Sequence, residues 1–179
     1  GGLLHTNIGT CAVFAAVSGS SVATAATIST VALPEFKKRN YSEKLVLGSI
    51  AAGATLGILI PPSVNMIIFG ALTNTSIGQL FAGGIVPGIL LTIAFMTCIV
   101  VIAKLYPKMV DQTKIEVSLC DKLKHSIHLL PAIFIFSVTM GSIYTGWATP
   151  SEAAGMGVIS SLIIAAVYKK LNFTLLNIC

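Results

Sequence analysis

The sequence predicts an all-α integral membrane protein, and three observations carry this prediction. The chain of 179 residues is 55% hydrophobic, contains 16 glycines and has only 9% charged residues. Because a soluble domain carries about 25% charged residues, this chain lacks the polar side chains needed to cover a surface exposed to water. Several uncharged stretches reach about 20 residues, the length of a helix that crosses a bilayer. The composition therefore excludes both a soluble globular domain and a disordered chain.

Polar and apolar stretches alternate along the chain and predict its organisation. We expect a first part over residues 1–103, a cytoplasmic interfacial connector over 104–126 and a second part over 127–179. The first part contains an uncharged stretch at about 11–33, a helix broken at a double proline at about 45–72, and a span over 80–103; the second contains spans over 127–147 and 149–168. Residues 1–10 are expected to be the tail of a preceding element. The stretch at 11–33 fits either one span or a re-entrant hairpin with two arms of about ten residues each.

The basic residues predict how these elements cross the bilayer. All 11 Lys and Arg residues lie within the three stretches 37–44, 104–124 and 169–170. Two crossings separate each stretch from the next, so a single assignment places all of them on the cytoplasmic side, as the positive-inside rule requires. This distribution indicates a multi-pass protein surrounded by lipid and argues against a nucleic-acid partner, which would need a continuous basic groove.

The connector over 104–126 has a periodicity of its own. Ile115, Leu119, Leu123 and Ile127 recur every four residues, with lysines between them. This pattern favours an amphipathic helix lying along the cytoplasmic interface, and a solvated loop is the alternative.

The placement of the acidic residues limits the chemistry that is available. Apart from Glu152, no Asp, Glu, Lys or Arg lies inside a predicted span. Glu152 stands at the start of the span over 149–168, where it fits a capping box with Thr149 and Pro150 that opens a helix. The cysteines and histidines show no metal-ligand spacing, and no nucleophile motif or phosphate loop is present, which argues against an enzyme and against a bound cofactor. An ion held within the membrane would therefore need neutral oxygen ligands.

Two segments supply neutral oxygens. Residues 18–24 combine a glycine with four hydroxyl side chains, and residues 53–65 contain Pro61 and Pro62, which interrupt a helix because proline lacks an N–H. A helix broken within the membrane exposes carbonyl oxygens that suit a cation and N–H groups that suit an anionic substrate. Uncharged oxygen ligands fit Na⁺ better than a transition metal. Close packing between helices is the alternative explanation for the same small residues.

Four motifs, in this order, resemble the large membrane subunit of tripartite ATP-independent periplasmic (TRAP) transporters: SGSSVATAAT at 18–27, GATLGILIPPS at 53–63, SIGQLFAGGIVPG at 76–88 and TPSEA at 149–153. The resemblance implies half of an elevator-type secondary transporter, with a re-entrant helical hairpin and a discontinuous helix. It also implies Na⁺-coupled import of an organic acid, such as a C4-dicarboxylate or sialic acid, across the bacterial inner membrane. A periplasmic substrate-binding protein and a small membrane subunit are the implied partners.

Carried over position by position, the resemblance assigns residues to a site. The Na⁺ ligands would come from the hairpin tip and the unwound helix: Ser18, Ser20, Ser21, Thr24, Thr55, Gly57 and Ser63. Gly19, Pro61, Pro62 and Asn65 would face the substrate. The resemblance implies no cofactor and no metal other than Na⁺, which would act as the coupling ion.

The family's second hairpin and second discontinuous helix have no counterpart in these residues, and both ends of the sequence look cut. Since such transporters bind substrate between inverted repeats, we expect a central fragment that supplies one side of the site. A truncated remnant or split subunit that inserts without transporting is one alternative. An unrelated channel or carrier with an independent double-proline break is another.

Overall fold

The computed structural model describes residues 2–39, 41–107 and 130–168, which form seven α-helices and no strand. Within these residues, three helical segments are long and apolar enough to cross a membrane: Glu43–Thr73, Ile77–Leu105 and Pro150–Val167. The predicted all-α membrane class is therefore confirmed. The contacts divide the chain into two units, Gly1–Ile115 and Glu116–Cys179, which are described separately below.

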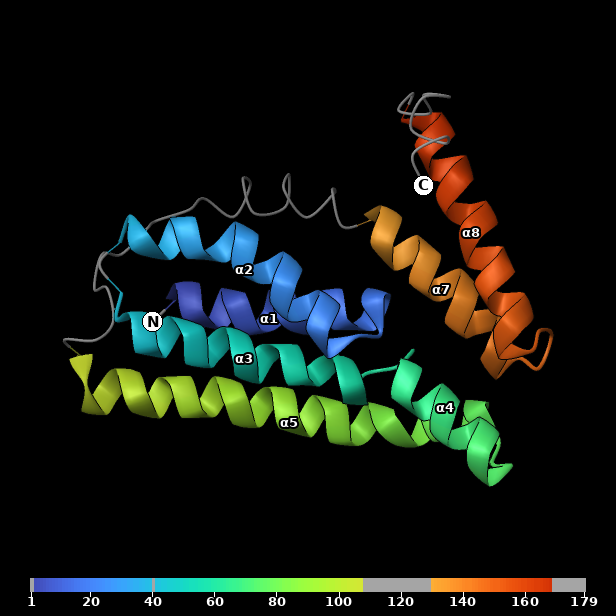
Figure 1. The fold of residues 1–179 in the computed structure, drawn as a ribbon, viewed down its shortest axis with the longest axis horizontal. Coiled ribbons are helices and arrows are strands. Elements are labelled where there is room, and N and C mark those ends of the chain that lie inside the picture. The colour runs from blue at the N-terminus through green and yellow to red at the C-terminus, as the bar shows by residue number, and fades with distance from the viewer. Residues whose placement is uncertain (1, 40, 108–129, 169–179) are drawn as a thin grey trace. The chain divides into compact units, whose positions relative to one another are not determined.

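The first unit begins with a helical hairpin made of α1 (Gly2–Ser18) and α2 (Ser21–Lys37) (Figure 1). Gly19 makes the turn with a φ of 61°, a left-handed conformation that glycine adopts at little cost. Ser20 then caps α2, because its hydroxyl oxygen accepts a hydrogen bond from the backbone N–H of Ala23 at 3.3 Å. The local sequence therefore ends one helix and starts the next within two residues.

The hairpin is longer than the predicted 11–33, since each arm has 17 residues. The expectation that residues 1–10 belong to a preceding element was wrong, because residues 2–10 are part of α1. Leu4, Ile8, Cys11 and Ala15 are all buried and form one continuous stripe, so the packing face of α1 extends through both halves of the helix. At the other end, α2 continues past Pro34 to Lys37, with Phe36 buried in the core.

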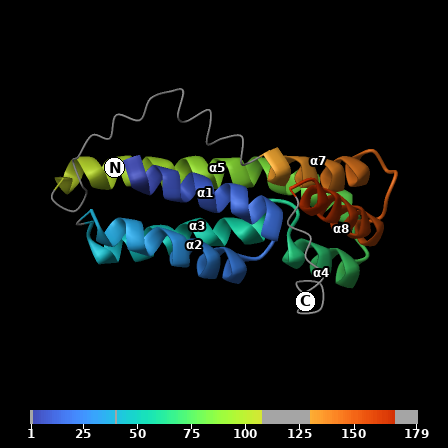
Figure 2. The same cartoon turned by 90° about the horizontal axis from the view of Figure 1, so that it is seen from above.

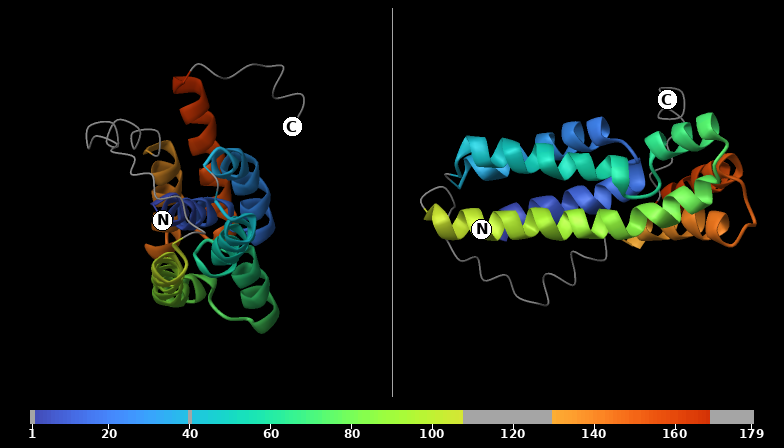
Figure 3. Two further views of the ribbon diagram at one scale, coloured as in Figure 1. Left: turned by 90° about the vertical axis from the view of Figure 1, so that its left-hand side faces the viewer. Right: turned by 90° about the horizontal axis from the view of Figure 1, so that it is seen from below.

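After the hairpin, α3 (Glu43–Leu59) and α4 (Val64–Thr73) form a helix interrupted over residues 60–63, and α5 (Ile77–Leu105) runs back alongside it. Figures 1 and 2 show α1, α2, α3 and α5 lying side by side, and Figure 3 (left) views them nearly end on. Helix α3 is central, because it contacts α1, α2, α4 and α5. The interruption at Pro61-Pro62 agrees with the predicted break at the double proline.

The core of this unit is apolar, with one polar pair inside it. Leu4 and Ile8 of α1, Phe36 of α2, Leu56 of α3 and Ile99 of α5 belong to one buried cluster. Between α1 and α3, the amide nitrogen of Asn7 donates to the hydroxyl of Ser49 at 3.0 Å, and that hydroxyl donates to the carbonyl of Val46 at 2.8 Å. Among the described residues, Asn7 Oδ1 has no hydrogen-bond partner. Because the hydrogen bond between Asn7 and Ser49 is buried, it fixes the register between α1 and α3.

Small residues set the distances between the helices. A Cβ atom on Gly53 would lie 2.7 Å from Cys11 Sγ, so α1 and α3 could not approach as closely with a larger residue there. A Cβ on Gly84 would lie 2.8 Å from the Leu59 carbonyl oxygen, and one on Gly88 would lie 3.0 Å from Ile60. At Gly53 the packing explanation is therefore correct, and Gly84 and Gly88 allow close packing in the same way.

The ends of the first unit differ in charge. The loop between α2 and α3 lies at the same end as the C-terminus of α5, while the turn from α4 to α5 lies at the opposite end (Figure 1). Ala103, near the end of α5, packs against the cluster that contains Phe36 and Val46. Basic residues 37–39 and 44 therefore share an end with Lys104, as the charge argument requires. At the opposite end, Asn74 caps α4 in a left-handed conformation with a φ of 54°.

The second unit contains α7 (Leu130–Tyr144) and α8 (Pro150–Val167), which pack against each other. The predicted capping box is present, because Thr149 N–H donates to Glu152 Oε2 at 2.7 Å and Glu152 N–H donates to Thr149 Oγ1 at 3.4 Å. Glu152 is therefore structural, as its sequence context indicates. The predicted amphipathic connector lies almost entirely outside the described residues; its first two residues, 104 and 105, belong to α5.

Candidate functional site

The hairpin tip lies directly against the interruption between α3 and α4. The backbone N–H of Val64, at the start of α4, donates to the carbonyl oxygen of Gly19 at 3.2 Å. Glycines make this approach possible, since a Cβ on Gly57 would lie 2.9 Å from the backbone carbon of Ser20. A Cβ on Gly19 would lie 2.5 Å from the carbonyl oxygen of Pro62. The backbone of the hairpin tip therefore contacts the backbone of the break between α3 and α4 directly.

Three oxygens converge on the inner side of the tip. Thr24 is fully buried, and its hydroxyl donates to the Ser20 carbonyl at 2.7 Å. The hydroxyls of Ser18 and Thr24 lie 3.1 Å apart, and the N–H of Ser20 donates to Ser18 Oγ at 3.4 Å. These uncharged oxygens could act together as ligands of a hard monovalent cation. They are Ser18 Oγ, Ser20 O and Thr24 Oγ1.

The break contributes its own oxygens. Pro61 and Pro62 cannot donate to the carbonyls of Gly57 and Ile58, which are their helical partners. Ser63 is fully buried and compensates at one of these positions, because its hydroxyl donates to the Ile58 carbonyl at 2.6 Å. The Gly57 carbonyl belongs to the turn that faces the tip and loses its regular helical donor.

Four helix ends meet at this junction. The C-termini of α1 and α3 bring partial negative charge, and the N-termini of α2 and α4 bring partial positive charge. A cation is favoured beside the former and an anionic group beside the latter. Among the described residues, no group of three or more His, Cys, Asp or Glu side chains could hold a metal. Backbone dipoles and hydroxyls therefore dominate the electrostatics of the junction.

The structure brings together most of the residues that the sequence singled out. Ser18, Gly19, Ser20, Thr24, Gly57, Pro62 and Ser63 take part in the contacts just described. Ser21 begins α2 and is half-buried, with its nitrogen 2.9 Å from a Cβ placed on Gly57. Pro61 is buried within the break, and Asn65 is exposed on the first turn of α4.

Thr55 is not brought to the tip. Its side chain is exposed, and its hydroxyl donates to the carbonyl of Ala52 in the preceding turn at 2.6 Å. Thr55 and Gly57 are two residues apart on one helix, a separation that points their side chains to different faces. Since Gly57 faces the tip, Thr55 faces away from it.

Two features of the junction were not foreseen from the sequence. One is the hydrogen bond between Val64 and Gly19, and the other is the use of Ser63 to satisfy the Ile58 carbonyl. The double proline could have indicated the role of Ser63, because a carbonyl that loses its backbone N–H donor needs another hydrogen-bond donor. The first joins residues distant in the sequence and has no local signal.

A helical hairpin with a hydroxyl-rich tip is thus seated on a break in an apolar helix, an arrangement found in membrane proteins with discontinuous helices. The chain belongs to the family of the DctM component of tripartite ATP-independent periplasmic transporters, whose family model matches residues 1–177. This membership confirms the resemblance seen in the sequence and removes the alternative of an unrelated channel or carrier.

Curated relatives place the chain within this family. It is 36% identical over 177 residues to the C4-dicarboxylate TRAP transporter large permease protein of Pseudomonas aeruginosa. This match covers 97% of this chain and 40% of the relative. It is 36% identical to the sialic acid TRAP transporter permease protein of Haemophilus influenzae, covering 100% of this chain and 29% of the relative. It is 33% identical to the ectoine/5-hydroxyectoine large permease protein of Ruegeria pomeroyi, covering 92% of this chain and 38% of the relative. The chain therefore spans well under half the length of these relatives, which are named as transporter permeases rather than enzymes.

Proposed function

We propose that this chain is the central part of a Na⁺-coupled permease, and that it binds Na⁺ where the hairpin tip meets the helix break. The observation that carries the proposal is the convergence of Ser18 Oγ, Ser20 O and Thr24 Oγ1 beside the break. Gly57 of α3 and Ser63, which precedes α4, would complete the surroundings of the ion. The partial negative charge at the C-termini of α1 and α3 supports a cation here without any acidic residue.

The substrate of the whole protein would be a small organic acid, such as a C4-dicarboxylate or sialic acid. The N-termini of α2 and α4 favour a carboxylate beside the ion. Gly19, Pro61, Pro62 and Asn65 would line this side of the substrate site. The relatives are named for different substrates. The family therefore supports a small organic solute as the substrate and does not indicate one compound.

The transport cycle we propose rests on membership of the DctM family. Helices α1 and α2 would form a re-entrant hairpin whose tip opens toward the cytoplasm in an elevator-type movement. A periplasmic binding protein would deliver the substrate, and a small membrane subunit would brace the moving part in the bacterial inner membrane. The basic end of the first unit, near residues 37–44, would face the cytoplasm.

Thr24→Val tests the Na⁺ site, because valine keeps the shape of threonine and removes the hydroxyl. Thr30→Val is the matched control: Thr30 lies on the same helix, is exposed and donates to the Thr27 carbonyl of α2 at 2.7 Å. In the full-length permease reconstituted with its partners, uptake of the organic acid is measured as NaCl replaces KCl. We expect Thr24→Val to raise the half-saturating Na⁺ concentration at least tenfold and Thr30→Val to leave it unchanged. Equal Na⁺ dependence in both variants would overturn the site.

A further inference from the structure

A groove lies between α1 and α2 at the base of the hairpin, away from the tip. It holds a half-open space of about 170 Å³. Its walls come from Leu3, Ile28, Val31, Ala32 and Phe36, with Thr6, Asn7, Thr10 and Glu35 among them. Almost all of the surface inside it is apolar. A dry cavity of about 150 Å³ with apolar walls accepts a small hydrocarbon rather than water, so this groove is large enough for a segment of an acyl chain.

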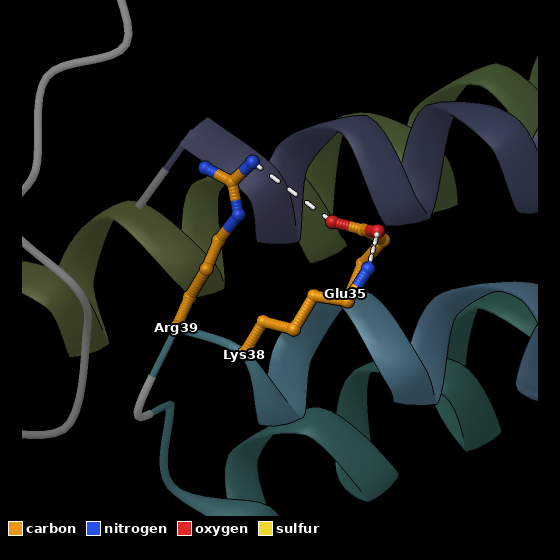
Figure 4. Close-up of polar contacts among 3 residues, drawn as sticks. All are labelled: Glu35, Lys38 and Arg39. Atoms are coloured by element: carbon orange, nitrogen blue, oxygen red, sulfur yellow. Dashed lines mark hydrogen bonds and ion pairs between the residues drawn. The ribbon is translucent and has the colours of Figure 1, made fainter.

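The mouth of the groove is charged. Glu35 lines the cavity and holds two cations beside it: Lys38 Nζ lies 2.9 Å from Glu35 Oε1, and Arg39 Nη2 lies 3.9 Å from Glu35 Oε2 (Figure 4). Lys37 adds a third cation in the last turn of α2. With three cations and one carboxylate, residues 35–39 carry a net charge of +2. The mouth therefore attracts an anion even with Glu35 ionised.

An apolar groove with a basic mouth fits one kind of membrane component. We propose that the base of the hairpin binds an anionic phospholipid, with part of an acyl chain between α1 and α2 and the phosphate on Lys38 and Arg39. The bilayer supplies this ligand directly, and basic pockets beside membrane helices recognise anionic headgroups. Lys38 and Arg39 can bind a phosphate while they are paired with Glu35. The guanidinium of Arg39 has five N–H donors, and the Lys38 side chain is 69% exposed. Glu35 keeps both cations close to a residue that lines the groove.

Native mass spectrometry of the full-length protein tests the proposal, with added phosphatidylglycerol compared against phosphatidylcholine. We expect retained phosphatidylglycerol to exceed phosphatidylcholine at least fivefold on the wild-type protein. Ala32→Leu fills the groove and K38Q/R39Q neutralises its mouth, so each variant should lose most of the preference. Ala26→Leu, on the exposed surface of α2, and Lys44→Gln, at the start of α3, are the matched controls and should retain it.

Two results would overturn this assignment. One is equal retention of both lipids by the wild-type protein, and the other is the same lipid binding by Ala32→Leu as by Ala26→Leu. If Ala32→Leu fails to fold, phosphatidylglycerol with a photoreactive acyl chain is used on the wild-type protein instead. Crosslinks to peptides of α1 and α2 around the groove support the site. Crosslinks confined to other segments, or a groove filled by another part of the protein, would rule it out.

Discussion

The backbone N–H of Val64 donates to the carbonyl oxygen of Gly19 at 3.2 Å, across 45 positions of sequence by their numbering. This hydrogen bond joins the hairpin tip to the first turn of α4 and so closes the junction between two breaks in regular structure. Because Gly19 and Gly57 both lack a side chain, the remaining backbone atoms of tip and break approach within contact distance. The predictions below concern this junction and the two ends of the first unit.

Gly57→Ala should separate the tip from α3. Its Cβ would lie 2.9 Å from backbone atoms of Ser20 and Ser21, which cannot move aside as a flexible side chain could. Overpacking of this kind costs about 1–3 kcal/mol, so we expect a lower temperature of unfolding in detergent and a weaker Na⁺ dependence of uptake. Gly48→Ala, on the same helix with nothing within 4 Å, should be neutral or slightly stabilising. A wild-type unfolding temperature for Gly57→Ala would contradict the close approach.

Ser63→Ala should destabilise the break. The substitution removes the hydroxyl that donates to the Ile58 carbonyl at 2.6 Å and leaves this part-buried carbonyl without its donor. Such a loss costs about 1–3 kcal/mol. Thermal unfolding of the purified protein measures this cost, and Ser63→Thr, which keeps a hydroxyl, should recover part of it. The interpretation fails if Ser63→Ala and the wild-type protein unfold at the same temperature.

Thr55→Val separates the sequence-based ligand assignment from the geometry of the structure. The Thr55 hydroxyl bonds to Ala52 and faces away from the tip, so we expect the half-saturating Na⁺ concentration to stay within about twofold of the wild-type value, a difference below about 0.5 kcal/mol. Na⁺-dependent uptake by the full-length protein is the measurement. A loss as large as that expected for Thr24→Val would place Thr55 among the ligands after all.

The two ends of the first unit should label from opposite sides of the membrane. Single cysteines at Lys38→Cys and Lys104→Cys lie at the basic end, and Asn74→Cys lies in the turn between α4 and α5. In a background with the native cysteines replaced, a reagent that does not cross the membrane should reach Asn74→Cys in whole cells and the other two only after lysis. Labelling of Lys38→Cys and Asn74→Cys from the same side would refute this topology.

Glu35 should titrate below the ordinary range of a glutamate. The hydrogen bond and the charge of Lys38 lower the pKa of the carboxyl, and Arg39 adds to the effect. Because the folded pKa is lowered, the ion pair stabilises the fold fully above the ordinary glutamate pKa and is lost as the pH falls through the lowered value. Lys38→Gln should raise the pKa of Glu35, measured by carbon NMR of its side-chain carboxyl. An unchanged titration midpoint would show that Lys38 does not hold Glu35.

Much of the fold follows from local sequence. The break at Pro61-Pro62 is dictated by missing N–H groups, and the capping box at Thr149 and Glu152 depends on contacts within four residues. The bounds of the hairpin were harder to predict. Helix α1 extends back to Gly2 because Leu4 and Ile8 pack in the same cluster as residues of α3. A contact between helices cannot be predicted from the residues around position 10, where the boundary was expected.

The sequence by itself determined the membrane class and the break at Pro61-Pro62, and its four motifs identified the family. The membrane class follows from composition, and the break follows from two prolines, which act on their immediate neighbours. Only the tertiary structure decided which hydroxyls share a site, since Ser18 and Thr24 meet beside Gly57 while Thr55 does not. The reason is physical: a helix places residues two positions apart on different faces, and only the partner helix determines which face is used.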